Sequence, residues 1–255
     1  MSEQDKYSDS AGVPWSGRSF QENSFSSDNG EADKDLIAAL LAFKVNPVNQ
    51  VEIADAFAKA RVLIPLLATL GESGEGAHGH AVDKSAELSI VSVNTPDNQN
   101  ALPVFTSVAS MAKWNADARP VPNNGRTVAL AAVAEGNTRV VLDPASETEY
   151  VLRRPALEAI AQGLAWQLTS ENPEVIYLVD ETLGSISEVV TFTLVNGDPK
   201  ADLSGQDLTI VIHLVPNLSK DRLREIELTL LESISASRRF IEIVDSVAIR
   251  FLEAS

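Results

Sequence analysis

The alternation of apolar and polar residues between positions 102 and 166 predicts a succession of short strands and helices. The motif LPVFTS at residues 102–107 opens this stretch, and its proline suits the start of a short strand because proline cannot donate to a sheet ladder. Phe105 is then expected to face a core. Thr106 and Ser107 are residue types that cap the N-terminus of a helix, here predicted over residues 108–114.

The rest of this stretch predicts a hairpin, a strand and a second helix. Two prolines in ARPVPNNG (residues 118–125) force an extended path, and its Asn-Asn-Gly is expected to reverse the chain. Apolar runs at 128–133 and 140–142 are separated by Glu-Gly-Asn-Thr, which is typical of a hairpin connection. A strand at 150–152 and a helix that begins at Pro155 complete the predicted unit.

Further helices and strands are predicted on the N-terminal side of this unit. Helical spacing over 35–43 and 48–60 is followed by an apolar run at 61–70, which predicts a buried strand. Residues 87–95 alternate as a half-buried strand, and the polar turn after them predicts a hairpin with LPVFTS. The expected fold is therefore α+β, with a mixed sheet packed by helices.

The C-terminal third of the chain predicts a second, smaller α+β domain. Strand patterns occur at 188–195 and 207–215, and an amphipathic helix is expected over 220–235. The last apolar runs, at 240–244 and 247–252, predict extended segments. The predicted division of the chain is a disordered acidic arm at 1–33, a first α+β domain at 34–168 and a smaller α+β domain at 174–255.

Several motifs taken together resemble one protein family. These motifs are LPVFTS, the tryptophan after it, ARPVP, the AEG before residue 137, VLDP at 141–144 and RRPALEAIA at 153–161. Together they are similar to the N-terminal domain of the SseB family, named for enhanced serine sensitivity. The segment GVPWSGRSF at 12–20 is similar to the arm of actinobacterial members, and RVLIP at 61–65 also fits. The resemblance implies a family defined by sequence, and it transfers no catalytic residue to this chain.

Composition narrows the classes of partner. The chain of 255 residues has Lys+Arg 20 against Asp+Glu 36, a formal net charge of −16, which disfavours nucleic acid and anionic membranes because both require clustered cations. The absence of cysteine excludes disulfides, thiolate metal sites and cysteine nucleophiles. No run approaches the roughly 20 apolar residues that span a bilayer, and no signal peptide is evident, so we expect a cytoplasmic protein.

The N-terminal arm combines a disorder-prone composition with interaction-prone side chains. Residues 1–33 are rich in Ser, Asp, Glu, Asn and Gly, which cannot offset their own ordering entropy. Trp15, Arg18 and Phe20 lie within this segment, and Trp and Arg are enriched at interaction hot spots. Either the arm docks on its own domain or it is a motif for another protein; a solvated tail without a role is the third interpretation.

The candidates for catalysis and metal binding are few. Asp143, Asp180 and Glu181 each lie beside an apolar run that would raise the pKa of a carboxyl group, although Asp143 before a proline also suits a turn. His213 lies within a strand pattern and is expected on the solvent face, with Val211 and Ile212 filling the core side. His78 and His80 on a Gly-rich loop make an incomplete metal site. No metal or cofactor is expected.

The basic pair Arg153-Arg154 is expected to meet Asp143 or Glu149 in a surface ion pair that contributes at most about 1 kcal/mol.

These patterns favour a non-catalytic binding or regulatory protein. It would recognise a protein partner through the arm, through a groove formed near Phe105, Thr106 and Trp114, or through both. The alternative is a small-molecule-binding protein or hydrolase-like enzyme that uses carboxylates near the domain junction. Self-association through the C-terminal sheet is a third hypothesis, and it requires an exposed strand such as 247–252.

Overall fold

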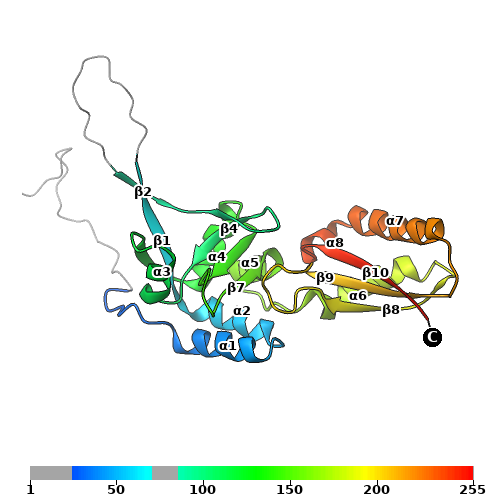
Figure 1. Ribbon diagram of the computed structural model, residues 1–255, viewed down its shortest axis with the longest axis horizontal. Coiled ribbons are helices and arrows are strands. Elements are labelled where there is room, and N and C mark those ends of the chain that lie inside the picture. Colours follow the sequence, from blue (N-terminus) through cyan, green and yellow to red (C-terminus); the bar gives the residue numbers. More distant parts are fainter. Residues whose placement is uncertain (1–24, 71–85, 255) are drawn as a thin grey trace, which may run out of the picture.

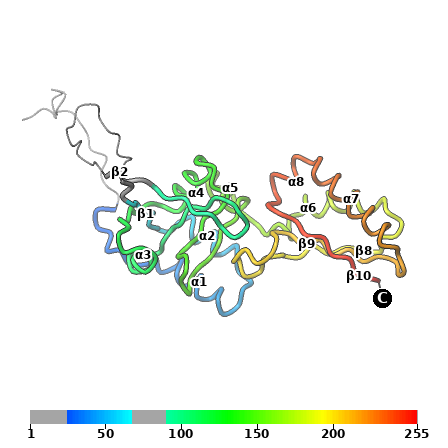
Figure 2. Tube along the Cα trace, turned by 45° about the horizontal axis from the view of Figure 1, so that its top comes forward, coloured from blue at the N-terminus to red at the C-terminus, as the bar shows by residue number. Residues whose placement is uncertain are grey.

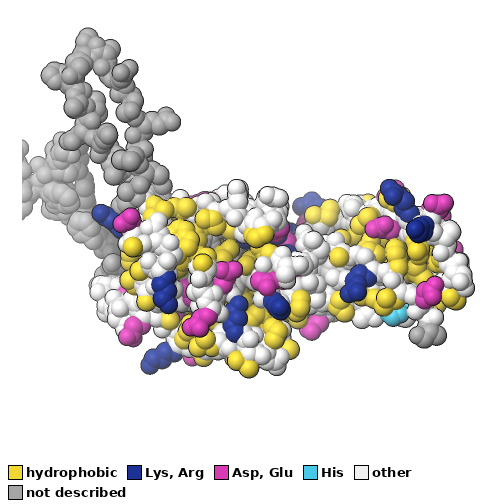
Figure 3. Space-filling model, viewed as in Figure 1, with side chains coloured by type: hydrophobic (Ala, Val, Ile, Leu, Met, Phe, Trp, Pro, Cys, Tyr) yellow, Lys and Arg dark blue, Asp and Glu magenta, His cyan; other side chains and the backbone are white. Residues whose placement is uncertain are grey.

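The computed structural model describes residues 25–70 and 86–254. The described chain forms two α+β lobes that lie side by side along the long axis of the molecule (Figure 1). Acidic and basic side chains are interspersed over the face shown in Figure 3, so neither sign of charge dominates it. None of the helices in these two ranges has the length and apolar character needed to cross a membrane. The predicted α+β fold class is confirmed.

The N-terminal lobe contains five helices and seven strands within the described residues. The helices are α1 (Lys34–Val45), α2 (Gln50–Lys59), α3 (Val108–Trp114), α4 (Gly125–Ala134) and α5 (Arg154–Gln162), and the strands are β1 (Arg61–Leu70), β2 (Ala86–Ile90), β3 (Val93–Asn94), β4 (Asn100–Val104), β5 (Arg119–Asn124), β6 (Arg139–Leu142) and β7 (Tyr150–Arg153).

Two sheets are joined at one residue pair to build this lobe. One is antiparallel with the order β2-β1-β5, and the other is mixed with the order β3-β4-β6-β7, in which β4 and β6 run parallel. Leu63 of β1 exchanges two backbone hydrogen bonds with Phe105, just beyond β4. The hydrogen bonding therefore continues from the first sheet to the second.

The main core lies between the sheets and helices α1, α2, α4 and α5. Its largest buried side chains include Phe43, Phe57 and Tyr150, and the rings of Phe43 and Tyr150 meet edge to face with their centroids 5.2 Å apart. A separate small cluster forms where α3 covers β1, from Leu63, Phe105 and Met111.

The C-terminal lobe is a three-stranded sheet with helices on one face. Its elements are η2 (Thr169–Glu171), α6 (Pro173–Leu183), β8 (Val189–Asn196), β9 (Leu208–Leu214), α7 (Lys220–Ala236), α8 (Arg238–Ile243) and β10 (Val247–Glu253). The order is β10-β9-β8, with β10 parallel and β8 antiparallel to β9. α7 and α8 form the crossover between the two parallel strands, and the buried side of the sheet packs against the helices.

The structure corrects two of the predicted elements. Residues 128–133 were expected to form a strand but lie within helix α4, because the Asn124 side chain caps its N-terminus and alanine, which is frequent here, has the highest helix propensity. Residues 135–138 are consequently a helix-to-strand connection and not a hairpin. Residues 240–244 were expected to be extended, but Ser237 caps the Phe240 N–H and the short helix α8 forms instead.

Other predicted elements agree with the structure. Helix α3 begins at the expected LPVFTS junction, where Ser107 and Ser110 form a reciprocal capping box. The strands at 61–70 and 140–142, and the amphipathic helix α7, are also present. The strand expected at 87–95 divides into β2, which pairs with β1, and β3, which forms the predicted hairpin with β4.

Candidate functional site at the junction between the lobes

A loop of the C-terminal lobe docks into the N-terminal lobe. This junction loop, residues 197–205, connects β8 to β9 and reaches the neighbouring lobe in Figure 2. The Ala201 side chain is buried in the main core of the N-terminal lobe, and its carbonyl oxygen accepts a 2.9 Å hydrogen bond from the Val151 N–H of β7. Because β7 is the edge strand of its sheet, the junction loop covers an edge that would otherwise be exposed.

Two glycines permit the base of the junction loop to close. A Cβ atom on Gly205 would lie 1.9 Å from the carbonyl oxygen of Gly197, which no side chain can tolerate. Within the loop Ala201 and Leu203 have φ angles of 50° and 64°, in the left-handed region that is costly for residues with a Cβ. The docked conformation is therefore held by its surroundings.

Asp198 organises the junction loop from inside. Its carboxylate, which is 3% exposed, accepts hydrogen bonds from the backbone N–H groups of Asp202 and Leu203 and from the Arg153 guanidinium at 2.7 Å. The amide of Gln50 on α2 donates to the Asp198 carbonyl oxygen at 3.1 Å. Both the side chain and the backbone of this residue are thus bound by the N-terminal lobe.

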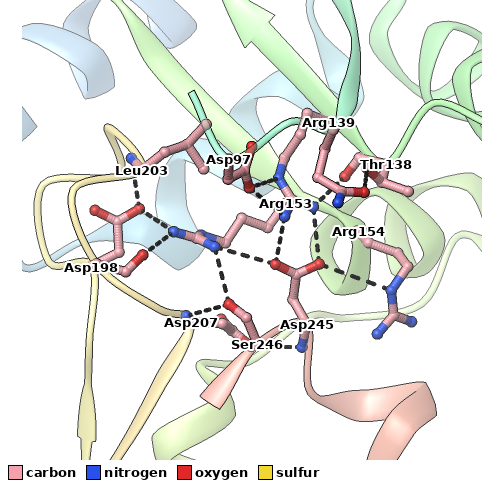
Figure 4. Close-up of polar contacts among 12 residues, drawn as sticks. Asp97, Thr138, Arg139, Arg153, Arg154, Asp198, Leu203, Asp207, Asp245 and Ser246 are labelled. Carbon is pink, nitrogen blue, oxygen red and sulfur yellow. Dashed lines mark hydrogen bonds and ion pairs between the residues drawn. The ribbon is translucent and has the colours of Figure 1, made fainter. Parts of the chain in front are cut away.

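Asp245, which precedes β10, lies at the centre of an ion-pair network between the lobes (Figure 4). Its two carboxylate oxygens accept from Arg139 at 2.8 and 2.7 Å, and one of them also accepts from Arg153 at 3.1 Å. Every guanidinium nitrogen of Arg139 donates, since Asp97 and the Thr138 carbonyl oxygen bind the remaining positions. The Asp245 side chain is 5% exposed and that of Arg139 is 4% exposed, so these charges are almost fully desolvated.

Arg154 forms a second bridge between the lobes. From the start of α5 its guanidinium donates to the carbonyl oxygens of Ile241, Glu242 and Val244, at 2.7, 3.0 and 2.8 Å. These carbonyls lie at the C-terminus of α8, where a helix presents partial negative charge and unsatisfied acceptors. A cation of the N-terminal lobe therefore caps a helix of the C-terminal lobe.

The network shifts the pKa values of three of its members. Burial raises the pKa of Asp207, and the charge of Asp245 raises it further. Hydrogen bonds from the Asp245 N–H and the Thr169 hydroxyl lower this pKa, but they do not cancel the increase. Partial burial would also raise the pKa of Asp97, but hydrogen bonds from Thr95 and Arg139 lower it overall. For Arg153, burial is outweighed by Asp198 and Asp245, so its pKa lies above the usual value.

The interior of the junction leaves little space. A small cavity beside Tyr150, Arg153, Trp166 and Asp198 measures about 20 Å³, which suits one water molecule and no larger ligand.

A larger groove opens on the surface beside the junction. This junction groove measures about 570 Å³ and is bordered by α5, the segment after it, and α8; its lining residues are Pro155, Glu158, Ala159, Gln162, Leu164, Ala165, Trp166, Gln167, Asn172, Arg239, Glu242 and Ile243. Leu164 is 61% exposed, whereas Trp166 is half-buried against the main core. Gln162 and Gln167, which also line the groove, are both exposed.

The charged side chains of the junction groove are already engaged in ion pairs. Glu158 pairs with Arg154 at 3.4 Å, Glu242 with Arg238 at 2.9 Å, and Arg239 with Glu174 at 2.8 Å. In the described part of the chain there is no group of three or more side chains suited to hold a metal ion.

The predicted binding residues near α3 make internal contacts. Phe105 is fully buried and its ring lies 5.3 Å from that of Trp114, which is half-buried. Thr106 is also buried, and its N–H and hydroxyl both donate to the Asp143 carboxylate, at 2.8 and 2.7 Å. Of these three predicted residues, only Trp114 presents part of its side chain at the surface.

The three candidate carboxylates are not brought together. Asp143 is buried after β6, where it also accepts from the Thr148 hydroxyl at 2.9 Å and fixes a turn with a φ of 43°. Asp180 and Glu181 are exposed on α6 in the other lobe. His213 is half-buried on β9, on the sheet face away from the helices; Ile212 faces the core as expected, but Val211 shares the face of His213.

The expectation for Arg153 and Arg154 is wrong. Neither residue pairs with Asp143 or Glu149; both bind the C-terminal lobe through Asp198, Asp245 and the end of α8. The predicted weak surface pair is in fact part of the buried network. Sequence reasoning did not identify Asp198 and Asp245 as the partners of these arginines, because they are distant in the chain. The signals available were the arginine pair itself and the Gly-Asp-Pro turn after β8.

The arm motif and the histidine loop lie outside the described residues: Trp15, Arg18, Phe20, His78 and His80. The last residues assigned to the arm are described and lie against the N-terminal lobe. Asp28 forms an ion pair with Arg61 at 3.0 Å, and the Gly30 carbonyl oxygen accepts from the Val108 N–H at the start of α3.

Comparison with known proteins identifies the N-terminal lobe. Residues 35–159 match the family model described as the SseB protein N-terminal domain, which spans α1 to the middle of α5. No curated protein and no solved structure matched the chain significantly. The match ends within the helix that borders the junction groove, so the groove is formed partly by this domain and partly by the chain after it. The chain therefore contains an SseB N-terminal domain over residues 35–159.

Proposed function

We propose that this chain is a non-catalytic binding protein, and that it recognises a peptide segment of a protein partner in the junction groove. The observation that carries the proposal is the groove itself. Its volume of about 570 Å³ lies within the range of roughly 300–1,000 Å³ of ligand-binding pockets, and domain interfaces are preferred locations for such sites.

The chemistry of the lining supports a peptide as the occupant. Leu164 offers an exposed apolar contact and Trp166 an aromatic one, and aromatic side chains are frequent anchors at interfaces. The exposed amides of Gln162 and Gln167 supply both donors and acceptors, which suit the N–H and C=O groups of a peptide backbone. An apolar peptide side chain would contact Leu164 and Trp166 while its backbone binds the two amides.

The net charge of the chain favours a partner segment with a basic residue. The charged side chains that line the groove are each paired with an opposite charge, but the whole chain carries a net charge of −16. This electrostatic field attracts cations and repels acidic segments.

The ion pairs within the groove favour binding over acid–base chemistry. General acid–base catalysis requires a carboxyl group with a proton affinity matched to its task and free access to substrate. Glu158 and Glu242 are instead bound to arginines, and hydrogen bonds from Arg238 and Arg239 lower the pKa of Glu242.

The experiment is a peptide selection followed by measured affinities. A random peptide library displayed on phage is selected on the full chain, and the recovered peptides are titrated by calorimetry into the wild type, Leu164→Glu and Leu228→Glu. Leu228 is a matched control, because it is 47% exposed on α7 and lies outside the groove. The expected result is an affinity loss of about tenfold or more with Leu164→Glu, as for a hot-spot residue, and no loss with Leu228→Glu.

Recovered peptides should also share an apolar residue next to a basic one. Peptides that bind Leu164→Glu as tightly as the wild type, or a selection that recovers none, would contradict the proposed function.

A further inference from the structure

Strand β8 is an exposed sheet edge without any charged residue. It spans eight residues, Val189–Asn196, and is the outer strand in the order β10-β9-β8 of the C-terminal lobe. Its sequence, VVTFTLVN, consists of β-branched, aromatic, apolar and amide side chains. Natural proteins usually protect such edges with charges, prolines or a cover, because an open edge pairs with other strands. In the described ranges no strand pairs with β8 on its outer side.

The register with β9 determines which backbone groups of β8 face outward. The Gly197 N–H donates to the Asp207 carbonyl oxygen, and the register from Asn196↔Leu208 to Thr191↔His213 continues without a shift. Since alternate residues of an antiparallel strand direct their backbone groups to opposite sides, Thr193 faces β9, whereas Phe192 and Leu194 present N–H and C=O groups to the open edge. These are the groups that a further strand would bind.

The β8 sequence is complementary to a second copy of itself. In an antiparallel pair centred on Thr193, the outward backbone groups of Phe192 meet those of Leu194 from the other copy, and Thr191 lies opposite Val195. Aromatic, β-branched and threonine pairs across strands are favourable, and no like charges are opposed. In a chain with a net charge of −16, an uncharged edge is where two copies meet with the least repulsion.

The helical layer beside β8 also presents an apolar side chain. On α6 the Thr182 hydroxyl lies 2.7 Å from that of Ser233 on α7, which identifies the flank that faces α7. Ile176 lies on the opposite flank by helical spacing and is 41% exposed. Because α7 and α8 cross over between β9 and β10, the free flank of α6 lies toward the β8 side of the lobe.

The other edge strand is less suited to self-pairing. β10 carries Arg250 at its centre and Glu253 at its end, and an antiparallel pair of two β10 strands centred on Arg250 would oppose two guanidinium groups. The comparison of the two edges selects β8 over the strand at 247–252.

We propose that two copies of this chain associate through β8, in antiparallel register around Thr193, to form a continuous six-stranded sheet with the order β10-β9-β8-β8-β9-β10. The interface is isologous, so each strand donates to and accepts from the same residues of the other. This inference does not depend on the peptide site in the junction groove.

The test uses charge reversal at the symmetry axis. Thr193 is exposed and lies opposite itself in the proposed dimer, where facing Cβ atoms are about 5 Å apart, so Thr193→Lys and Thr193→Glu each oppose like charges. The full chain is studied by sedimentation velocity at about 100 µM, because the weakest specific interfaces have a Kd in the micromolar range. The expected mass is twice the monomer mass of 27.4 kDa. Each variant alone is expected to give the monomer mass, and an equimolar mixture of the two is expected to regain the dimer.

Circular dichroism tests whether both variants are folded. Arg250→Glu is the control on the other edge and should remain dimeric. The regained dimer in the mixture separates self-pairing at Thr193 from a general loss of stability. A monomeric wild type would overturn the proposal and would leave the edge to an extended segment of another protein. A dimer that persists in Thr193→Lys, or a mixture that stays monomeric, would overturn it as well.

Discussion

Replacing Asp245 with asparagine should destabilise the whole chain by a predictable amount. The substitution keeps the size of the side chain but removes the charge that compensates Arg139 and Arg153, whose hydrogen bonds to Asp245 measure 2.7 to 3.1 Å. Breaking a buried ion pair by removing one partner costs about 3–5 kcal/mol. Arg139 retains Asp97 and Arg153 retains Asp198, so we expect the lower end of this range, about 3 kcal/mol.

This loss is measurable by urea and thermal unfolding. At roughly 2–4 °C per kcal/mol for a chain of this size, a loss of about 3 kcal/mol lowers the melting temperature by roughly 6–12 °C. The matched control is Arg238→Gln, because the Arg238 side chain is 94% exposed although it also forms an ion pair, with Glu242. Exposed pairs contribute about 0–1 kcal/mol, so the control should change little.

A double-mutant cycle assigns the effect to the network. In an Arg139→Gln background, Asp245→Asn should cost at least about 1 kcal/mol less than in the wild type, since the main partner is already absent. If Asp245→Asn changes the free energy of unfolding no more than Arg238→Gln does, the junction is solvated and the argument from burial is refuted.

Three further substitutions probe the junction and the C-terminal lobe. Asp207→Asn should raise the free energy of unfolding at neutral pH, because burial raises the pKa of Asp207 and the folded state therefore favours the protonated carboxyl group. The gain over the wild type should shrink as the pH falls below the pKa of Asp207 in the folded state. Unfolding curves between pH 4 and 8 would measure this change. Gly205→Ala should lower the free energy of unfolding by about 3 kcal/mol or more, since its Cβ would lie 1.9 Å from a carbonyl oxygen. Gly136 has open space around it but a φ of +75°, so Gly136→Ala should lower the free energy of unfolding by only about 1–2 kcal/mol in the same assay. Hydrogen bonds from Arg222 lower the pKa of Glu188 to about 2, so this pair contributes stability above pH 4.5 that is lost as the pH falls toward 2. In Arg222→Gln, an NMR titration of the carboxyl group should show the pKa of Glu188 returning toward 4.5. An unchanged pKa would contradict the pairing.

The sequence predicted the elements whose apolar spacing or caps are local. Helix α3 follows from the serine cap after LPVFTS, and the strand 61–70 follows from its apolar run. The run at 128–133 misled because its alanines and valines fit a buried strand and a buried helix equally well, and the Asn124 cap decides between them.

The junction could not be predicted from local patterns. Asp245 lies 106 residues from its partner Arg139 and 92 residues from its partner Arg153 along the chain. The sequence around one of these residues does not specify the other. The groove has the same origin, because Trp166 and Arg239 are brought to one surface only when the lobes dock.

The binding role of the junction groove is tested most directly by the indole N–H resonance of Trp166 in a proton–nitrogen correlation spectrum. The chain has three tryptophans, and a Trp166→Phe variant assigns the signal. A peptide selected on the wild type should shift the Trp166 signal in proportion to saturation and leave that of Trp114, which lies in the cluster beneath α3, unchanged. A saturating peptide that leaves the Trp166 signal in place would contradict the groove as the binding site.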